Sequence, residues 1–133
     1  MQLRVTDFGC AEYYHPNNEK SSKGTEIYMA PEIMKGEEYD GYKVDIFAMG
    51  VVLYLIVDGI FPFHSAVREE DRFFNLLTSS NSDKNKMYWK ELGSESLSEN
   101  FKDLFSSMTA YNPAERPSLS EIKNHPWVLT YAN

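Results

Sequence analysis

Blocks of apolar residues separated by polar stretches predict a mostly helical chain. The densest block covers residues 46–57, IFAMGVVLYLIV. Asp45 precedes it as a candidate N-cap, and Gly59 follows it as a natural helix stop. The block is apolar on nearly every face, so we expect a helix surrounded by protein. It is too short for a bilayer-spanning helix, which needs roughly 20 residues.

Four other segments carry shorter helical signals. One turn is expected over residues 32–36, where glycine stops it, and an amphipathic helix over 69–77 behind an acidic first turn. In residues 98–108 a serine cap precedes apolar residues at helical spacing. Residues 118–125 open with a Ser-x-x-Glu capping box, the start of the last expected helix.

The remaining stretches predict a strand and two loops. Polar and apolar side chains alternate from Gln2 to Thr6, which favours a short strand. Residues 10–25 are rich in Asn, Ser, Lys and Gly without any period, and we expect a mobile loop there. Residues 78–86 are polar, and we expect a solvated loop.

Composition narrows the class of protein. With 42% hydrophobic and 14% aromatic residues, the chain can bury a core. A net charge of −7 argues against binding to nucleic acid or to an anionic membrane. The single cysteine, Cys10, excludes an internal disulfide and favours a reducing, cytoplasmic location. No His, Cys and Asp residues stand at the spacing of a zinc site.

Five short motifs follow one another in a fixed order. They are D-F-G at residues 7–9, G-T-x-x-Y-x-A-P-E at 24–32, D-x-F-x-x-G at 45–50, N-P-x-x-R-P at 112–117 and H-P-W at 125–127. Six fixed positions in the second motif arise by chance in about one chain in a million. Together the motifs resemble those of eukaryotic-type Ser/Thr protein kinases, from the activation segment onward. Phe47 stands where tryptophan is usual.

The resemblance implies a fold and a subgroup. It covers residues 1–128 and leaves 129–133 as a tail. The fold it implies is mainly α: the C-terminal, helical lobe of the kinase fold with one short N-terminal strand, an incomplete domain. The apolar helix, the F-P-F turn at residues 61–63 and the H-P-W ending are most similar to the calmodulin-dependent kinase group.

The resemblance also implies roles at the D-F-G motif. In a complete kinase, which uses ATP and Mg²⁺, Asp7 would ligate the Mg²⁺ that bridges the ATP phosphates. Phe8 would pack under the site. Gly9 would allow the backbone to swing between active and inactive states. A turn-forming Asp-x-Gly at a strand end is the structural alternative.

Further roles fall on the second motif. Thr25 is similar to the threonine whose hydroxyl helps to position the substrate hydroxyl. Gly24, Tyr28 and Met29 would line, together with Thr25, the pocket for the residue that follows the phosphoacceptor. An apolar Met29 implies an apolar or tolerant preference in that pocket.

Ser21 matches the position of the usual activating phosphosite, and Ser22 is its neighbour. A phosphate there would add negative charge and order the loop against basic side chains, with an upstream activating kinase as a partner. The alternative is a solvated loop of Ser and Lys without regulation.

Two further positions would support the structure. The family pairs the equivalents of Glu32 and Arg116 in a buried bidentate ion pair. Asp45 would anchor the catalytic loop from the apolar helix, and without that loop its role would be helix capping.

The sequence contains no glycine-rich loop, no strand lysine and no His-Arg-Asp loop. We therefore expect residues 1–133 alone to bind neither ATP nor Mg²⁺ tightly and to be inactive. One interpretation is a portion of an active kinase that phosphorylates Ser or Thr of protein substrates. The other is a non-catalytic, kinase-like interaction module or decoy. In either case the apolar helix is expected to leave an uncovered apolar patch.

Overall fold

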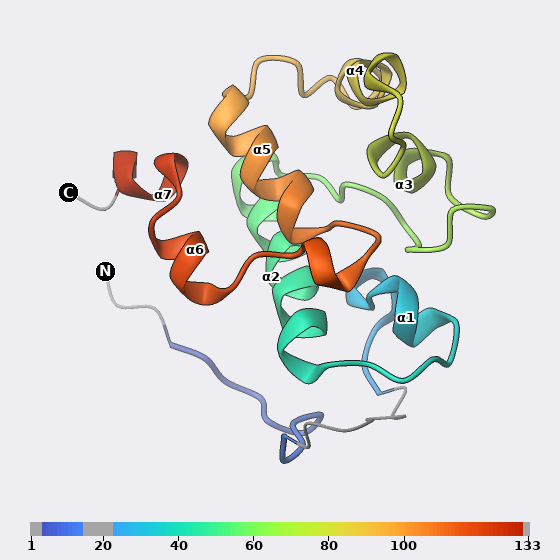
Figure 1. Cartoon of the computed structure of the whole chain (residues 1–133), viewed down its shortest axis with the longest axis vertical. Coiled ribbons are helices and arrows are strands. Elements are labelled where there is room, and N and C mark those ends of the chain that lie inside the picture. Colours follow the sequence, from blue (N-terminus) through green and yellow to red (C-terminus); the bar gives the residue numbers. More distant parts are fainter. Residues whose placement is uncertain (1–3, 15–22, 132–133) are drawn as a thin grey trace.

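The computed structural model describes residues 4–14 and 23–131, and they form a mainly helical molecule (Figure 1). A long central helix, α2, lies between the short N-terminal elements and the C-terminal helices. The elements in chain order are the 3-10 turn Glu26–Tyr28, α1 (Pro31–Met34), α2 (Gly41–Asp58), α3 (Arg72–Leu77), α4 (Ser82–Glu91), α5 (Glu99–Met108), the 3-10 turn Pro113–Glu115, α6 (Leu119–Lys123) and α7 (Pro126–Tyr131). The expected mainly helical fold class is confirmed.

The short strand expected over Gln2–Thr6 is not formed in the part that the structure describes. Residues 4–6 have no regular secondary structure, and Val5 is 79% exposed. A strand is stable only where a neighbouring strand accepts and donates its backbone hydrogen bonds. The alternation of side chains alone does not supply that partner.

The apolar helix α2 begins earlier than its sequence indicates. Asp40 caps it by accepting the N–H of Tyr42 at 2.9 Å, and Gly59 ends it in the left-handed conformation with φ 81°. Asp45, the expected cap, therefore lies inside the helix and is exposed. Aspartate is a favoured N-cap residue at either position. Gly41 is a weak helix former, so nothing in the sequence indicated that the first turn of the helix begins there.

One face of α2 is buried and the opposite face is open. Phe47, Val51 and Tyr54 are completely buried against the core. Met49, Val52 and Ile56 are 45%, 41% and 74% exposed on the other side, in line with the exposed Tyr42. The expected apolar patch on this helix is therefore present within the described residues, while the expected burial on all sides is wrong.

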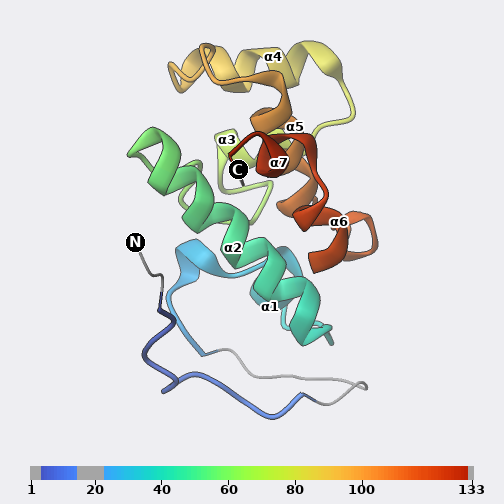
Figure 2. The same ribbon diagram turned by 90° about the vertical axis from the view of Figure 1, so that its left-hand side faces the viewer.

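Helices α2 and α5 pack against each other, and Figure 2 shows α2 in a view turned by 90° from Figure 1. The contact point is Gly50, where a Cβ atom would lie 2.9 Å from Cγ2 of Thr109 and 3.0 Å from Cβ of Met108. Thr109 is completely buried, and its hydroxyl donates to the carbonyl of Phe105 at 2.8 Å. The neighbours of Gly50 therefore have little room to move.

We expect Gly50→Ala to lower the free energy of unfolding by about 1–3 kcal/mol, because it overpacks a fixed contact. Urea unfolding followed by circular dichroism measures the loss. Met49→Ala is the matched control: it changes the neighbouring, half-exposed position and should cost much less. An unchanged or raised stability of Gly50→Ala would show that the two helices separate easily.

Helix α3 starts at Arg72, three residues later than expected, because Asp71 is its cap. The Asp71 carboxylate is buried and accepts the N–H of Phe74 at 2.9 Å. It also accepts the N–H groups of His64 at 2.7 Å and Ser65 at 3.2 Å. These bonds fasten the loop after α2 to α3.

The loop expected over residues 78–86 is wrong from residue 82 onward, where α4 begins. Asn81 caps this helix by accepting the N–H groups of Asp83 and Lys84. The side-chain amide of Asn85 donates to three carbonyl groups at the end of α3, those of Leu76, Leu77 and Ser79. Tertiary contacts of this kind stabilise a helix whose first turns carry only polar residues.

The C-terminal helices α5 and α6 match their expected starts. Ser98 caps α5, and the capping box of Ser118 and Glu121 is formed at α6. The pKa of the Glu121 carboxyl is lowered by the Ser118 backbone and side-chain hydrogen bonds. Helix α7 was not expected, since His125-Pro126 was interpreted as an end. Nδ1 of His125 instead accepts the N–H of Trp127 at 3.2 Å.

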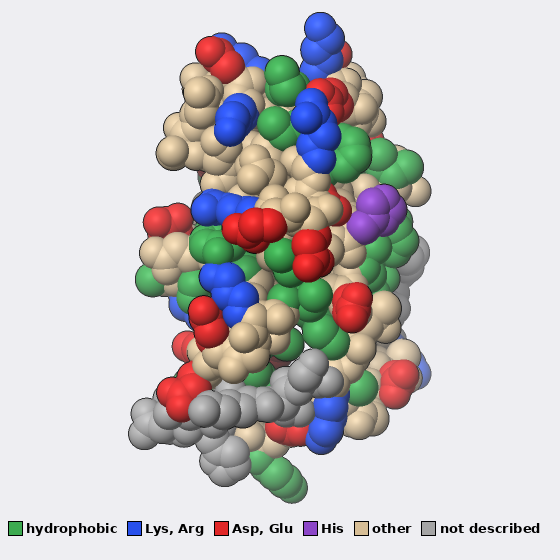
Figure 3. Space-filling model, turned by 90° about the vertical axis from the view of Figure 1, so that its right-hand side faces the viewer, with side chains coloured by type: hydrophobic (Ala, Val, Ile, Leu, Met, Phe, Trp, Pro, Cys, Tyr) green, Lys and Arg blue, Asp and Glu red, His purple; other side chains and the backbone are tan. Residues whose placement is uncertain are grey.

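Charged side chains of both signs are interspersed over the face shown in Figure 3. In the described part of the chain, no helix combines the length and apolarity that a bilayer crossing requires.

Candidate functional site

The D-F-G motif forms a tight turn in the exposed N-terminal segment. Asp7 has a positive φ of 61°, a conformation that non-glycine residues rarely adopt. Its Oδ1 atom accepts the N–H of Gly9 at 3.3 Å, and the carbonyl of Phe8 accepts the N–H of Ala11 at 3.0 Å. Phe8 is 69% exposed, so the packing that the resemblance implies for this ring is not present in the structure. Such strained turns are often found at functional sites.

Asp7 fits one part of a magnesium site. Mg²⁺ takes six oxygen ligands and usually accepts only one or two from protein carboxylates, with phosphate and water as the rest. Asp7 provides a single carboxylate. Among residues 4–14 and 23–131, no group of three His, Cys, Asp or Glu side chains is arranged to hold a metal ion.

The two described arms of the 10–25 loop are tied together and to α2. Nζ of Lys23 lies 2.5 Å from Oε1 of Glu12, and this ion pair raises the pKa of Lys23. The ring of Tyr14 lies 4.4 Å from the ring of Tyr42 at the start of α2. The candidate phosphosites Ser21 and Ser22 lie outside the described residues.

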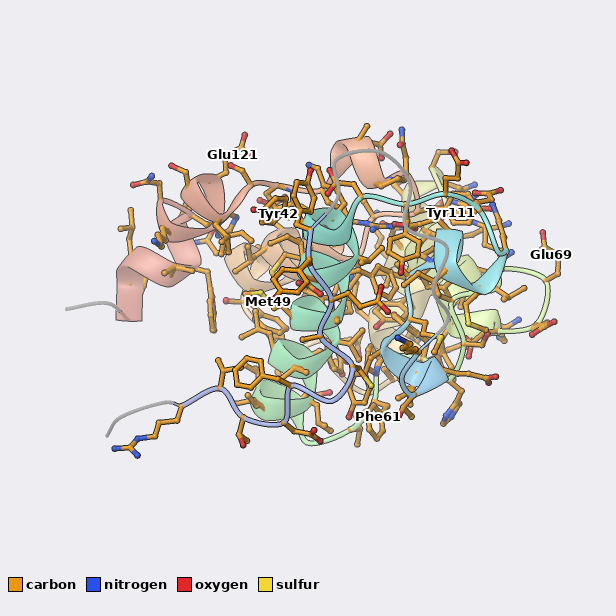
Figure 4. The ribbon with its side chains drawn as sticks, turned by 90° about the horizontal axis from the view of Figure 1, so that it is seen from below. Tyr42, Met49, Phe61, Glu69, Tyr111 and Glu121 are labelled. Atoms are coloured by element: carbon orange, nitrogen blue, oxygen red, sulfur yellow. The ribbon has the colours of Figure 1, made fainter. Side chains whose placement is uncertain are left out.

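The second motif brings Gly24, Thr25 and Tyr28 together in one short turn. Gly24 has a φ of 118°, which a larger residue would adopt only with strain. The carbonyl of Thr25 accepts the N–H of Tyr28 at 3.0 Å. Thr25 is exposed. The ring of Tyr28 meets the ring of Phe61, which is labelled in Figure 4, edge to face, with 6.0 Å between the ring centres. Thr25 is therefore open to solvent.

Met29 does not line an open surface. It is buried with 8% exposure, beneath the turn, and its methyl group would lie 3.9 Å from a Cβ atom at Gly24. The apolar floor of this turn is thus Met29, whereas Tyr28 is half-buried.

Glu32 and Arg116 form a bidentate ion pair, although 84 positions separate them. The two contacts are 2.6 Å from Nη1 to Oε1 and 2.8 Å from Nη2 to Oε2. Glu32 is 5% exposed and Arg116 is 2% exposed. The pair therefore fastens α1, which contains the last two residues of the second motif, to the loop between α5 and α6.

Arg116 has further partners that sequence reasoning missed. Its Nε atom donates to the carbonyl of Ala110 at 2.9 Å, and Nη1 donates to the carbonyl of Lys43 at 3.0 Å. Nζ of Lys43 donates to the carbonyl of Arg116 at 2.5 Å in return. The guanidinium lies over the Phe47 ring, 5.0 Å from its centre. Residue types alone give no signal for these main-chain acceptors.

A second polar group is buried at the far end of α2. The Tyr54 hydroxyl lies 2.7 Å from Oγ of Ser94, which in turn donates to Oδ2 of Asp58 at 2.6 Å. Burial raises the pKa of Tyr54. A negative charge such as Asp58 is unfavourable in the last turn of a helix. Its position in the sequence could therefore have indicated that the Asp58 side chain has a hydrogen-bond partner.

Comparison with known proteins gives the family. The protein kinase domain model matches residues 1–128. The SNF-related serine/threonine-protein kinase of Homo sapiens is 37% identical over 95% of this chain and 15% of its own length. The serine/threonine-protein kinase DCLK3 of Homo sapiens is 33% identical over 96% of this chain and 19% of its own. Calcium-dependent protein kinase 1 of Oryza sativa is 35% identical over 95% of this chain and 23% of its own.

The chain thus spans less than a quarter of each of these relatives. The family model nevertheless covers nearly the whole chain, and all three relatives are named as kinases. The chain belongs to the protein kinase domain family.

Proposed function

We propose that residues 1–128 are the helical, substrate-binding part of a Ser/Thr protein kinase catalytic domain of the calmodulin-dependent group. The observation that carries the proposal is the Glu32–Arg116 pair. It holds the exposed Thr25 turn on a rigid helical base, which suits a loop that must position a substrate hydroxyl. The complete protein would act in the cytoplasm, on protein substrates and downstream of an activating kinase.

Each site residue has a limited task in this proposal. Asp7 would offer one carboxylate oxygen to Mg²⁺, which neutralises phosphate charge when it is bound with ATP. The hydroxyl of Thr25 would orient the acceptor side chain of the substrate. Gly24 and Tyr28 would form the shelf beside it, above the buried Met29. Phosphate at Ser21 or Ser22 would add charge close to the Glu12–Lys23 pair.

Residues 1–133 alone provide one of the several groups that hold ATP and Mg²⁺ in a kinase. We therefore propose that the isolated chain transfers no phosphate. The test supplies the rest of the domain from a relative: residues 1–128 replace the matching segment of the human SNF-related kinase.

We expect this hybrid to phosphorylate Ser or Thr in a peptide substrate, and we expect Asp7→Asn to remove the activity because the metal loses its carboxylate. Asp83→Asn is the control: it removes an exposed carboxylate on α4 and should leave the rate unchanged. Radiolabelled phosphate transfer is the measurement, and a cooperative melt shows that each hybrid is folded. A folded hybrid that is inactive, or one that Asp7→Asn leaves active, contradicts the proposal.

The alternative of a non-catalytic interaction module rests on the open face of α2. Tyr42, Met49, Val52 and Ile56 are all exposed along one side of the helix, and Figure 4 shows Tyr42 and Met49 on it. Exposed apolar patches of this kind mark interaction surfaces.

We expect the isolated chain to enhance the fluorescence of a dye that binds apolar surface, and to self-associate. Met49→Lys and Val52→Lys should together reduce both effects, because they place charge in the patch. Leu119→Lys and Leu129→Lys form the control pair, which charges exposed apolar positions away from α2. A monodisperse monomer without dye binding would exclude this alternative.

A further inference from the structure

A cavity of about 630 Å³ lies where the end of α3, the start of α4 and the end of α5 meet. Its volume is within the range of ligand pockets, roughly 300–1,000 Å³. Neither Asp7 nor a residue of the Thr25 turn lines it. Phosphoryl transfer, as proposed above, therefore does not use this cavity.

Arg68, in the loop before α3, lines the cavity and is held in one orientation there. Its Nε atom donates to the hydroxyl of Thr78 at 2.8 Å, and Nη2 donates to the carbonyl of Thr78 at 2.6 Å. The guanidinium also lies over the ring of Tyr111, 3.7 Å from the ring centre. A guanidinium that is fixed in advance loses little freedom when it pairs with an anion.

The charge of Arg68 has no carboxylate partner in the described part of the chain. Arg68 is half-buried, and its partners are a hydroxyl, a carbonyl and a ring, all of them neutral. Its Nη1 atom makes no hydrogen bond within residues 4–14 and 23–131. Charged groups that are partly buried in proteins are usually paired, so this guanidinium is suited to an anion from outside the chain.

Lys84, in the first turn of α4, is a second cation in the same wall. It is exposed, and it forms no ion pair with any residue that the structure describes. The neighbouring lysine of α4, Lys86, pairs with Asp83 at 3.7 Å and does not line this cavity. The ammonium group of Lys84 therefore keeps its donors for a ligand.

The carboxylates nearby do not occupy these two cations. Glu115 lines the cavity, whereas Glu69 and Glu70 line an adjoining hollow that shares Arg68 and Lys84. None of the three glutamates forms an ion pair with either cation within the described ranges. With a net charge of −7 the chain as a whole repels anions, so binding here depends on direct contact with fixed donors.

The rest of the wall provides hydroxyl groups. Ser79, Ser80 and Ser106 line the cavity together with the two cations. The hydroxyls of Ser80 and Ser106 make no hydrogen bond to the part of the chain that the structure describes. A phosphate monoester carries about −1.5 to −2 charge and three strong acceptor oxygens, which match two cations and several hydroxyl donors. A carboxylate has one charge and two oxygens, and it would leave donors unused.

We propose that this cavity binds a phosphate monoester, with Arg68 and Lys84 balancing its charge and the serine hydroxyls donating to its remaining oxygens. The group belongs either to a phosphoserine of a protein or to a small phosphorylated molecule. Both present the same three terminal oxygens to the wall.

The test measures the binding of a fluorescently labelled peptide to the 133-residue chain by fluorescence anisotropy. The peptide contains one phosphoserine among alanine and glycine residues. We expect saturable binding, and we expect the same peptide with glutamate in place of phosphoserine to bind about tenfold more weakly. Equal binding of the two peptides, or binding that does not saturate, would overturn the proposal.

Two charge reversals on α4 locate the site. Lys84→Glu should weaken the binding of the phosphoserine peptide about tenfold, because it turns a pairing charge into a repelling one. Lys86→Glu is the matched control: it makes the same change of net charge on the same helix, at a side chain that is 80% exposed. Equal losses in the two variants would show a general effect of charge and would contradict the assignment.

Arg68→Lys tests the guanidinium itself. It keeps the positive charge but removes the planar fork, and it should weaken binding about tenfold. Because Arg68 also holds Thr78, a cooperative melt shows whether this variant is folded. Undiminished affinity in the folded variant would contradict the role of Arg68. If the variant does not fold, the comparison of Lys84→Glu with Lys86→Glu decides.

Glycerol phosphate, added as a competitor of the labelled peptide, identifies the source of the phosphate group. Weaker binding of glycerol phosphate than of the peptide supports a phosphorylated protein as the partner, and the reverse order supports a small molecule. Failure of glycerol phosphate to displace the peptide at any concentration would contradict a site that recognises the phosphate.

Discussion

Replacing Glu32 with alanine is expected to lower the free energy of unfolding by about 3–5 kcal/mol. The change leaves the guanidinium of Arg116 buried at 2% exposure without its carboxylate. Two carbonyl acceptors remain, from Ala110 and Lys43, but they do not balance the charge. Urea unfolding followed by circular dichroism measures the loss. A loss below about 1 kcal/mol, the range of exposed ion pairs, would contradict the prediction.

Glu37→Ala is the control for this prediction. Glu37 lies just after α1, and its carboxylate is 3.9 Å from Nζ of Lys35, but its side chain is 58% exposed, so we expect almost no loss of stability.

Replacing both Glu32 and Arg116 by methionine should recover part of the stability that Glu32→Ala loses. The double change removes the buried charges together and leaves no uncompensated one.

Phe47→Ala is expected to cost about 3–5 kcal/mol, because it opens a cavity in the aromatic centre of the core. Phe47 is completely buried, 5.9 Å from the ring of Phe63 and 6.1 Å from the ring of Phe74. It also carries the Arg116 guanidinium on its face. The resemblance places tryptophan here, and an aromatic ring of either kind can make such ring and guanidinium contacts.

Thermal and urea unfolding of Phe47→Ala measure this cost. Val52→Ala is the control on the same helix, since Val52 is 41% exposed on the open face and its truncation should change the stability little. Equal losses in the two variants would mean that the open face is covered in solution.

Sequence patterns predicted those helices whose ends carry strong local signals. Gly59 ends α2 as expected, and the capping box at Ser118 starts α6. Helix α4 was not predicted because its first turns are polar and part of its support comes from carbonyls outside the helix, such as those that Asn85 binds. The local sequence also could not decide whether Asp40 or Asp45 caps α2, because aspartate is a favoured N-cap residue at either position.

Local sequence patterns predicted less of the candidate site than of the helices. The pairing of Glu32 with Arg116 was inferred from the family resemblance, because no sequence periodicity relates positions 84 residues apart. The exposure of Phe8 and the burial of Met29 depend on what packs nearby, which a motif does not specify.

The separation of Glu32 and Arg116 has a consequence for synthesis of the protein. A ribosome releases the chain from its N-terminus, so Glu32 emerges well before its partner. Until Arg116 follows, the Glu32 carboxylate stays hydrated, and α1 is not fastened to the loop between α5 and α6. The turn that presents Thr25 is therefore expected to be among the last parts of the nascent chain to settle. A ribosome that stalls before it reads the codon of Arg116 would leave that turn open to proteases.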